Sequence, residues 1–163
     1  MNPCKCGYFK DPEKNCNCNI NDIKKYQSKI SWPLLDRIDM LLEIPRENID
    51  KILRNIAEES SASIRDKVVN ARKIQQKRFI WLGICSNAQI TSKHIDQLIP
   101  LDDACKSFLA EASRKLILST RVVHRTMKLA RTIADIQNQD TVTINHLAEA
   151  LQYRSKTMFV ENE

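Results

Sequence analysis

Four cysteines near the N-terminus form two close pairs whose spacing allows metal chemistry. The pairs are Cys4-x-Cys6 and Cys16-x-Cys18, and a nine-residue turn separates them. Four thiolates supplied by two turns can close a tetrahedral zinc site, which would stabilise a segment with too little apolar content to fold by itself. One residue between paired ligands is tighter than the commoner two, so four free thiols on a loop remain the alternative. We expect a structural zinc ion bound by Cys4, Cys6, Cys16 and Cys18.

Basic side chains gather on one side of the helix that we expect over residues 120–137. On a helical wheel the apolar residues occupy the opposite side, so the basic side is a continuous stripe. Its members are Arg121, His124, Arg125, Lys128 and Arg131. We expect Lys128 and Arg131 to contact nucleic acid, although a solvated helix face would give the same pattern. Arg121 begins the helix, where a cation opposes the helix dipole, and this points to a phosphate nearby.

Glycine is scarce, which excludes the common phosphate-binding loops. The 163 residues include only Gly7 and Gly83, whereas an average composition of about 7% would give about eleven. The G-x-x-x-x-G-K-[ST] and G-x-G-x-x-G loops need more glycines, because only glycine lets backbone amides approach a phosphate in those turns. We therefore expect that this chain by itself neither binds ATP tightly nor hydrolyses it.

The remaining composition describes a soluble domain with a basic centre. Hydrophobic residues make up 42% and charged residues 28%, and the formal net charge is +6. Residues 51–100 carry nine basic and four acidic side chains, which suits a polyanionic partner or a solvated helix face. No apolar stretch is long enough to span a bilayer or to form a signal-peptide core. We expect a cytoplasmic protein without a membrane partner, in which disulfides are disfavoured.

The segment after the cysteines predicts a helix, a short turn and a strand. Apolar residues recur at helical spacing from Asn19 onward, with Asn19 or Asn21 as the capping residue, which predicts a helix to about residue 30. The sequence Ser31-Trp32-Pro33 marks a break, and one short turn over residues 34–39 follows it. Met40–Ile44 is a mostly apolar run ended by Pro45, which predicts a buried strand.

Beyond Pro45 the pattern is almost entirely helical. We expect helices over residues 49–57, 63–79, 91–98, 101–117, 120–137 and 144–153. Ser119 can cap the fifth of these helices and Thr143 the last. Cys85 and Cys105 lie far from the first four cysteines and are expected to be buried as small apolar residues.

Three separated motifs together resemble one protein family. They are Met1-Asn2-Pro3-Cys4-x-Cys6-Gly7-Tyr8, Ser31-x-Pro33-Leu34-Leu35-Asp36-Arg37-Ile38-Asp39 and Ala130-Arg131-Thr132-Ile133-Ala134-Asp135, with Asp11-Pro12 and Cys16-x-Cys18 between the first two. In order and spacing they resemble the magnesium-chelatase-related AAA+ ATPases of the ComM/YifB type, over nearly the whole chain. The resemblance covers the C-terminal third of such a protein and implies that the P-loop and the Walker B carboxylates lie upstream of Met1.

This resemblance implies a mainly α fold in two parts. Residues 45–163 would form the helical, magnesium-chelatase-type C-terminal lid of an AAA+ ATPase. Residues 1–44 would be a distal remnant of the α/β nucleotide-binding core that carries the Cys-rich, zinc-knuckle-like loop. The lid would then hold the basic helix, and the remnant would hold the cysteine pairs.

The resemblance also assigns nucleotide-related roles to three residues. Asn2 matches sensor 1, the polar residue that orients the attacking water near the γ-phosphate. Arg37 matches the arginine finger, which reaches the nucleotide of a neighbouring subunit. Arg121 matches sensor 2, which contacts nucleotide phosphates and couples the lid to nucleotide state. A guanidinium suits both arginine roles because it neutralises charge on the transferred phosphoryl group.

Three positions depart from the family's usual pattern. Lys5 stands where the family usually has proline, and Lys10 stands where glycine is common. Trp32 replaces the usual glycine between Ser31 and Pro33, which can fix or misplace the arginine-finger turn. A split or decaying reading frame would account for these changes, and so would a separate upstream polypeptide that supplies the missing half.

The function implied by the resemblance is that of an ATPase acting on DNA, as in competence-related helicases and branch migration. A partner would supply the P-loop half, ATP and Mg²⁺ would bind only with that half, and homologous subunits would form a ring, expected to be a hexamer. Two other interpretations stay open. One is a zinc-stapled basic helical module that binds nucleic acid or protein without ATPase activity, and the other is an inactive remnant of a split gene.

Overall fold

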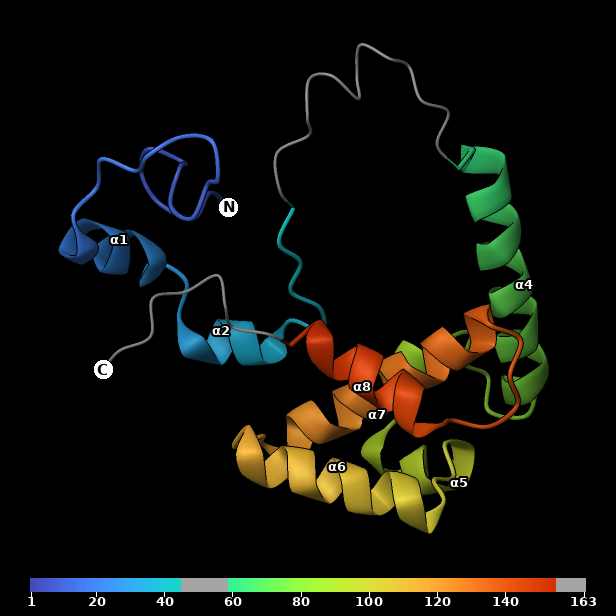
Figure 1. Cartoon of the computed structure of the whole chain (residues 1–163). Coiled ribbons are helices and arrows are strands. Elements are labelled where there is room, and N and C mark those ends of the chain that lie inside the picture. The colour runs from blue at the N-terminus through green and yellow to red at the C-terminus, as the bar shows by residue number, and fades with distance from the viewer. Residues whose placement is uncertain (45–58, 155–163) are drawn as a thin grey trace. The chain divides into compact units, whose positions relative to one another are not determined.

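The computed structural model describes residues 1–44 and 59–154, and every regular element in these ranges is a helix (Figure 1). The chain divides into two compact units, Met1–Ala57 with Arg154–Glu163, and Glu58–Tyr153. The expected mainly α fold is therefore confirmed. The boundary that we expect between residues 44 and 45 stays a prediction, and the helix expected over residues 49–57 lies outside the described residues.

The first unit contains two short helices that follow the cysteine loop, residues 4–18, along the chain. Helix α1 covers Ile20–Gln27, and its capping residue Asn19 accepts a hydrogen bond from the backbone N–H of Asp22 at 2.7 Å. The buried Gln27 side chain donates to the carbonyl of Pro3 at 2.9 Å, which ties α1 to the start of the cysteine loop. The helix predicted from Asn19 is confirmed.

Helix α2 covers Trp32–Arg37 and follows the predicted break. Pro33 lies in its first turn, where the missing N–H costs no helical hydrogen bond. Leu35 is buried in this helix. The turn expected over residues 34–39 is therefore helical and begins at Trp32, two residues earlier.

The predicted strand Met40–Ile44 is wrong. Residues 40–44 carry no regular structure, and the side chains of Leu42 and Ile44 are 56% and 86% exposed. A strand persists only when its N–H and C=O groups pair with a neighbouring strand, and the described parts of the chain offer no such neighbour. An apolar run by itself is therefore not enough to form a strand here.

The second unit is a small helical bundle. Its helices are α4 (Ser61–Phe79), α5 (Ile95–Leu98), α6 (Asp103–Lys115), α7 (Thr120–Ile136) and α8 (Ile144–Gln152), with two 3-10 turns, η1 (Asn87–Gln89) and η2 (Ser92–His94). Helices α4, α6 and α7 each begin at a capping side chain, from Ser60, Asp102 and Ser119. The helix expected over residues 91–98 is instead the turn η2 followed by the one-turn helix α5.

Helix α7 is the central element of this bundle (Figure 1). It packs against α8, the second half of α4 and the turn η1, and α6 packs on α8. Its buried apolar side chains join those of the neighbouring elements in one core, which includes Phe79, Ile95, Ile99, Leu109, Met127, Ala130, Leu147 and Ala150. Burial of each phenylalanine, isoleucine, leucine or methionine side chain in this core contributes about 1.5–3 kcal/mol.

Two further sequence expectations have different outcomes. Cys105 is buried as expected, and its thiol lies 3.6 Å from the carbonyl oxygen of Val142. Cys85 is exposed, so the expectation that it is a core residue is wrong. It lies in the loop before η1, which places its side chain toward solvent. Among the described helices, none combines the length and the apolar character that crossing a bilayer requires.

Candidate functional site

The four N-terminal cysteines converge on one point. Cys4 Sγ lies 3.3 Å from Cys6 Sγ and 3.7 Å from Cys16 Sγ, and Cys6 and Cys16 are 3.5 Å apart. With Cys18 included, all four sulfur atoms lie within 4.8 Å of one another. Zn–S bonds of about 2.3 Å in a tetrahedron place the sulfurs about 3.8 Å apart. The four thiols are therefore arranged so that they can hold a metal ion.

The electrostatics of the cluster also suit a cation. The pKa of Cys6 is lowered to about 6, chiefly by a hydrogen bond from the backbone at Tyr8 and then by the Cys4 thiol. A backbone hydrogen bond from Cys18 lowers the pKa of Cys16, but burial and the neighbouring thiols outweigh it and raise that pKa to about 12. Without a cation, the cluster therefore cannot hold four negative charges near neutral pH. A divalent ion would stabilise the thiolates.

Local turns position the two cysteine pairs. Gly7 has φ +84°, a conformation that glycine adopts readily, and its N–H donates to the carbonyl of Cys4 at 3.1 Å. Asp11 Oδ1 accepts from the backbone N–H groups of Glu13 and Lys14, which closes the turn between the pairs. Lys10 also has a positive φ, +62°. A left-handed conformation at this position gives a physical reason for the glycine that the family commonly has there.

The first unit also carries Asn2 and Arg37, both exposed. Asn2 borders a cleft of about 790 Å³ that Cys6, Tyr8 and Leu42 also line. Arg37 ends helix α2, where its Nη1 lies 3.5 Å from the carbonyl oxygen of Pro33. The nucleotide-related roles of Asn2 and Arg37 therefore stay predictions.

Arg121 lies in the second unit, at the second residue of α7. Its side chain is exposed, and it lies two residues after the N-terminal cap Ser119, whose Oγ accepts from the backbone N–H of Val122 at 3.3 Å. The free N–H groups and the helix dipole make this end electropositive. An exposed arginine here adds a positive charge to a site that already favours an anion.

Arg131 does not belong to an exposed basic stripe, so this part of the prediction is wrong. Its side chain is 3% exposed, and its Nε donates to Asp135 Oδ1 at 3.0 Å. Its other guanidinium nitrogens donate to the carbonyls of Gln139 and Asp140. Burial lowers the pKa of Arg131, although Asp135 opposes that shift. The helical wheel treated every charged residue as solvated, whereas a buried carboxylate one turn away holds this guanidinium inside the protein.

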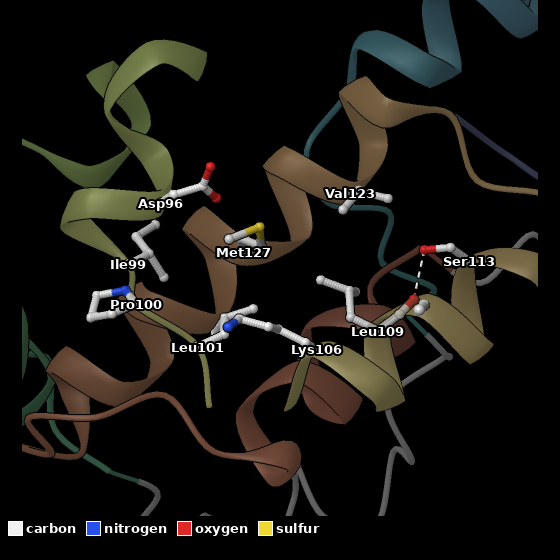
Figure 2. Close-up of a pocket in the computed structure, with 10 residues that line it drawn as sticks. Asp96, Ile99, Pro100, Leu101, Lys106, Leu109, Ser113, Val123 and Met127 are labelled. Atoms are coloured by element: carbon white, nitrogen blue, oxygen red, sulfur yellow. Dashed lines mark hydrogen bonds between the residues drawn. The ribbon is translucent and has the colours of Figure 1, made fainter. Parts of the chain in front are cut away.

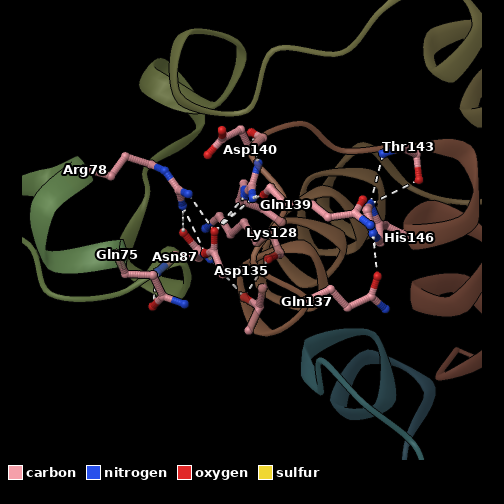
Figure 3. A network of polar contacts seen from close by, with 12 residues as sticks. Gln75, Arg78, Asn87, Lys128, Asp135, Gln137, Gln139, Asp140, Thr143 and His146 are labelled. Atoms are coloured by element: carbon pink, nitrogen blue, oxygen red, sulfur yellow. Dashed lines mark hydrogen bonds and ion pairs between the residues drawn. The ribbon is translucent and has the colours of Figure 1, made fainter. Parts of the chain in front are cut away.

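Asp135 is the centre of a buried polar network that sequence reasoning missed (Figure 3). Arg78 from α4 reaches its two carboxylate oxygens at 2.5 and 3.0 Å, and Asn87 from η1 donates to it at 2.8 Å. Desolvation alone would raise the pKa of Asp135, but the bonds from Arg78 and Asn87 lower it overall. The network joins α4, η1 and α7. The i, i+4 spacing of Arg131 and Asp135 was the available sequence signal.

His146 is a second buried titratable group in this unit. Its Nδ1 accepts from the backbone N–H of Thr143 at 3.0 Å, and its Nε2 lies 3.0 Å from Gln137 Oε1, so Nε2 carries the proton (Figure 3). This arrangement caps the start of α8. Burial, and then the charge of Arg131, lower the pKa of His146.

Lys128 is the remaining residue of the predicted nucleic-acid surface. It is half-buried, and its Nζ donates to the carbonyl of Ala88 at 3.2 Å. The structure therefore brings the four cysteines together, and it leaves Asn2, Arg37 and Arg121 as separate exposed positions.

Comparison with known proteins gives two family matches along the chain. The family described as magnesium chelatase, subunit ChlI, matches residues 1–52, and the family described as magnesium chelatase, subunit ChlI C-terminal, matches residues 58–154. The second match covers most of the helical unit and more than half of the chain. The order of the matches agrees with the order of the motifs.

Curated relatives support the same assignment. The competence protein ComM of Haemophilus influenzae is 36% identical over 163 residues, which is 99% of this chain and 31% of that protein. The uncharacterized protein YifB of Escherichia coli is 35% identical over 156 residues, or 95% of this chain and 30% of that protein. The chain thus spans a little under a third of the length of these relatives. It belongs to the magnesium-chelatase-related family of the ComM/YifB type.

Proposed function

We propose that this chain provides the distal part and the helical lid of an AAA+ ATPase that acts on DNA. The observation that carries the proposal is the match of both magnesium chelatase families in order along one chain. A polypeptide with the family's P-loop would supply the pocket for ATP and Mg²⁺, and homologous subunits would assemble as a ring, with six as the expected number. This chain would add catalytic arginines to the pocket.

In this proposal Arg37 acts on the nucleotide of a neighbouring subunit, and Arg121 acts on the nucleotide next to its own lid. Exposure of both side chains supports the assignment, because a buried guanidinium could not reach a phosphate. The position of Arg121 at a helix N-terminus is a further support, since that site attracts anions. Asn2 would orient the attacking water, and the cleft beside it leaves its amide accessible.

The DNA-binding part of the proposal now rests on Lys128. Arg131 is left out because Asp135 and two carbonyl groups hold its guanidinium inside the unit. A Lys128→Ala variant of the assembly should bind DNA more weakly, and the slope of affinity against salt should fall because one phosphate contact is lost. Fluorescence anisotropy with a labelled duplex at several salt concentrations measures both quantities.

ATP turnover tests the ATPase proposal. The purified chain should not hydrolyse ATP, and addition of a polypeptide carrying the family's P-loop should produce turnover. Arg37→Ala should then lower turnover steeply, since an arginine finger is worth about 10³–10⁵ in rate in related nucleotide hydrolases. Lys115→Ala, a change at an exposed lysine of α6, is the matched control and should leave turnover unchanged. If Arg37→Ala leaves the ATP turnover of the assembly unchanged, the result would favour a module without ATPase function.

We also propose that the cysteine cluster binds a structural zinc ion. Four thiolates leave no open position for a substrate, so zinc would stabilise the fold of the loop and take no part in a reaction. The purified protein should contain about one zinc per chain, and Cys6→Ser should release it without unfolding the helical unit. Cys85→Ser is the matched control because Cys85 is exposed and outside the cluster. Zinc that stays bound in Cys6→Ser would contradict the proposal.

A further inference from the structure

A long basic run of the chain has no role in the proposed function. Residues 67–95 contain six basic side chains and no acidic one. Arg78 is bonded to the buried Asp135, and the other five basic side chains are exposed. Most of the run belongs to helix α4 and the turn after it. A polyanion is therefore the class of partner that this surface attracts.

Two of these cations, Lys73 and Lys77, lie on the face of α4 opposite its packed side. The buried residues of α4 are Ala71, Gln75 and Phe79. Each lysine comes two residues after a buried one, which places it about 200° around the helix. Within the part of the chain that the structure describes, neither lysine forms an ion pair with a carboxylate. Both ammonium groups can therefore bind an anion from outside the chain.

Trp81 continues the same face beyond the end of α4. Ile80 keeps helical backbone angles, φ −52° and ψ −33°, so Trp81 follows Lys77 by one turn, a rise of about 6 Å. The indole is 59% exposed, which is unusual for tryptophan. The other aromatic side chains described in this unit are buried or half-buried, namely Phe79, Phe108 and Tyr153. We call Lys73, Lys77 and Trp81 the α4 face.

The turn after α4 holds the indole on the surface. The N–H of Leu82 donates to the carbonyl of Phe79 at 2.9 Å, and the side chains of Leu82 and Ile84 pack against the core. Gly83 between them has φ +65°, which lets the chain reverse there. Trp81 is therefore presented by an anchored backbone, so a ligand that contacts it loses little entropy in ordering the chain.

The α4 face is separate from the apolar groove of this unit. Figure 1 shows α4 at the edge of the unit, where an extended ligand can lie along it. The acid-free run ends at Asp96, which with Lys106 lines a groove of about 620 Å³ between α5, α6 and α7 (Figure 2). That groove has one charged side chain of each sign and so does not share the basic character of the α4 face.

We propose that the α4 face binds single-stranded nucleic acid. The two lysines contact phosphates and the indole stacks on an unpaired base, the combination that is typical of single-strand sites. Trp81 favours nucleic acid over an acidic peptide, because every base offers a π face on which an indole can stack. The choice of DNA as the strand rests on the proposed function, whereas the site itself needs neither ATP nor a P-loop polypeptide.

Tryptophan fluorescence of the full chain tests the stacking. The chain has two tryptophans, and Trp32→Phe leaves Trp81 as the only one. Oligothymidylate of about ten nucleotides should quench its emission in a saturable way. A duplex of the same length should quench far less, because its bases already stack on one another, and polyglutamate should not quench. Absence of quenching by oligothymidylate, or equal quenching by the duplex or by polyglutamate, would overturn the proposal.

Fluorescence anisotropy with labelled oligothymidylate separates the two kinds of contact. Trp81→Ala should weaken binding about 5- to 150-fold, the effect of losing one stacked base, whereas Trp81→Phe keeps a ring and should lose much less. The double variant Lys73→Ala/Lys77→Ala should lower the slope of log affinity against log salt by about 0.7 for each lysine. Unchanged affinity in Trp81→Ala, or an unchanged slope in the double variant, would contradict the assignment.

Matched controls on α6 separate the α4 face from general surface effects. Lys106→Ala/Lys115→Ala removes two charges from exposed lysines, and Ile117→Ala removes part of an exposed apolar side chain. Both controls should bind oligothymidylate like the wild type. Losses as large as those of the α4 variants would mean general attraction and would overturn the proposal.

Lys128→Ala distinguishes this inference from the proposed function. It should weaken duplex binding and leave the quenching of Trp81 by oligothymidylate unchanged, because Lys128 is not part of the α4 face. ATP turnover that depends on Arg37, found without any quenching of Trp81, would overturn this inference and leave the proposed function in place.

Discussion

At the scale of single residues, Asp135 accepts hydrogen bonds from side chains on three elements of the helical unit, α4, η1 and α7. Two arginines from different helices and one asparagine bond to its carboxylate, and the side chain is fully buried. A buried ion pair is not by itself strong evidence of stability, because desolvation offsets much of the attraction. Removal of one partner is different, since it leaves buried charge unpaired.

Asp135→Asn should therefore destabilise the helical unit by about 3–5 kcal/mol. The neutral amide has nearly the same shape but leaves Arg78 and Arg131 facing each other without a counter-charge. Lys115→Ala, which breaks the exposed ion pair with Glu111, should cost less than about 1 kcal/mol. Urea unfolding of both variants gives the two values. If the two variants lose the same free energy of unfolding, the buried network contributes no more stability than an exposed ion pair does.

His146 makes the stability of the same unit depend on pH. Its pKa in the folded state is lowered from the ordinary value of 6.5, so between these two pKa values the unfolded state binds more protons. The free energy of unfolding should then be constant above about pH 7 and fall as the pH drops through 6.5. His146→Gln keeps a side chain that can accept from Thr143 but does not titrate.

Urea unfolding of the wild type and of His146→Gln at pH 7.5 and pH 5.5 measures this effect. The wild type should lose more stability between the two pH values than the variant does. If both lose the same amount, the buried histidine is not the source of the pH dependence.

The sequence could predict which side chains meet at a site where their spacing along the chain is enough to bring them together. The cysteine pairs are close in sequence, so their convergence in space follows from two turns and was predicted. The partners of Asp135 come from α4, η1 and α7, and only the fold brings Arg78 within 2.5 Å of it. For that reason the helical wheel misplaced Arg131 on the surface.

At the scale of elements, helices α6 and α7 end in the same hydrogen-bonded turn. Leu118 N–H donates to the carbonyl of Ser113, and Gln139 N–H donates to the carbonyl of Ala134, the pattern of a Schellman cap. The residue before each donor has a positive φ. In α7 it is Asn138, which tolerates that conformation, but in α6 it is Ile117, whose branched side chain does not.

Ile117→Gly should therefore stabilise the helical unit by about 1 kcal/mol, because glycine adopts φ +50° without a steric cost. Ile117 is 91% exposed, so little packing is lost. Ile117→Ala is the control, since alanine keeps the steric cost and should give a much smaller gain. Thermal unfolding should show a higher midpoint for the glycine variant. A lower midpoint would show that the turn is not strained.

Periodicity and capping residues predicted the helices of the second unit well because those signals are local. Ser119 and the apolar face of α7 are examples, and both lie within one helix. The strand Met40–Ile44 failed because pairing is not local, and no described segment pairs with it. The predicted end of α6 at residue 117 was also wrong, because the helix ends at Lys115. Nothing in the sequence indicated this, since Ile117 is not the glycine that usually follows a helix terminus.

At the scale of the whole molecule, the proposed function makes this chain one part of a larger ATPase. Family membership rests on matches along the chain. Catalysis would depend on contacts between subunits, and a single chain does not contain them. The sequence could predict the family because its motifs are contiguous. The pockets assigned to Arg37 and Arg121 follow only from the resemblance to the family, because the spacing of residues within one chain does not define contacts between subunits.

ATP turnover of mixed assemblies tests whether Arg37 acts on the nucleotide of a neighbouring subunit. One preparation combines Arg37→Ala chains with an intact P-loop polypeptide, and the other combines wild-type chains with a P-loop polypeptide that cannot bind ATP. Each should be nearly inactive by itself. If Arg37 acts on the nucleotide of a neighbouring subunit, mixing the two should restore part of the turnover, because some intact arginines then face intact pockets. Turnover that stays at the level of the separate preparations would contradict the account.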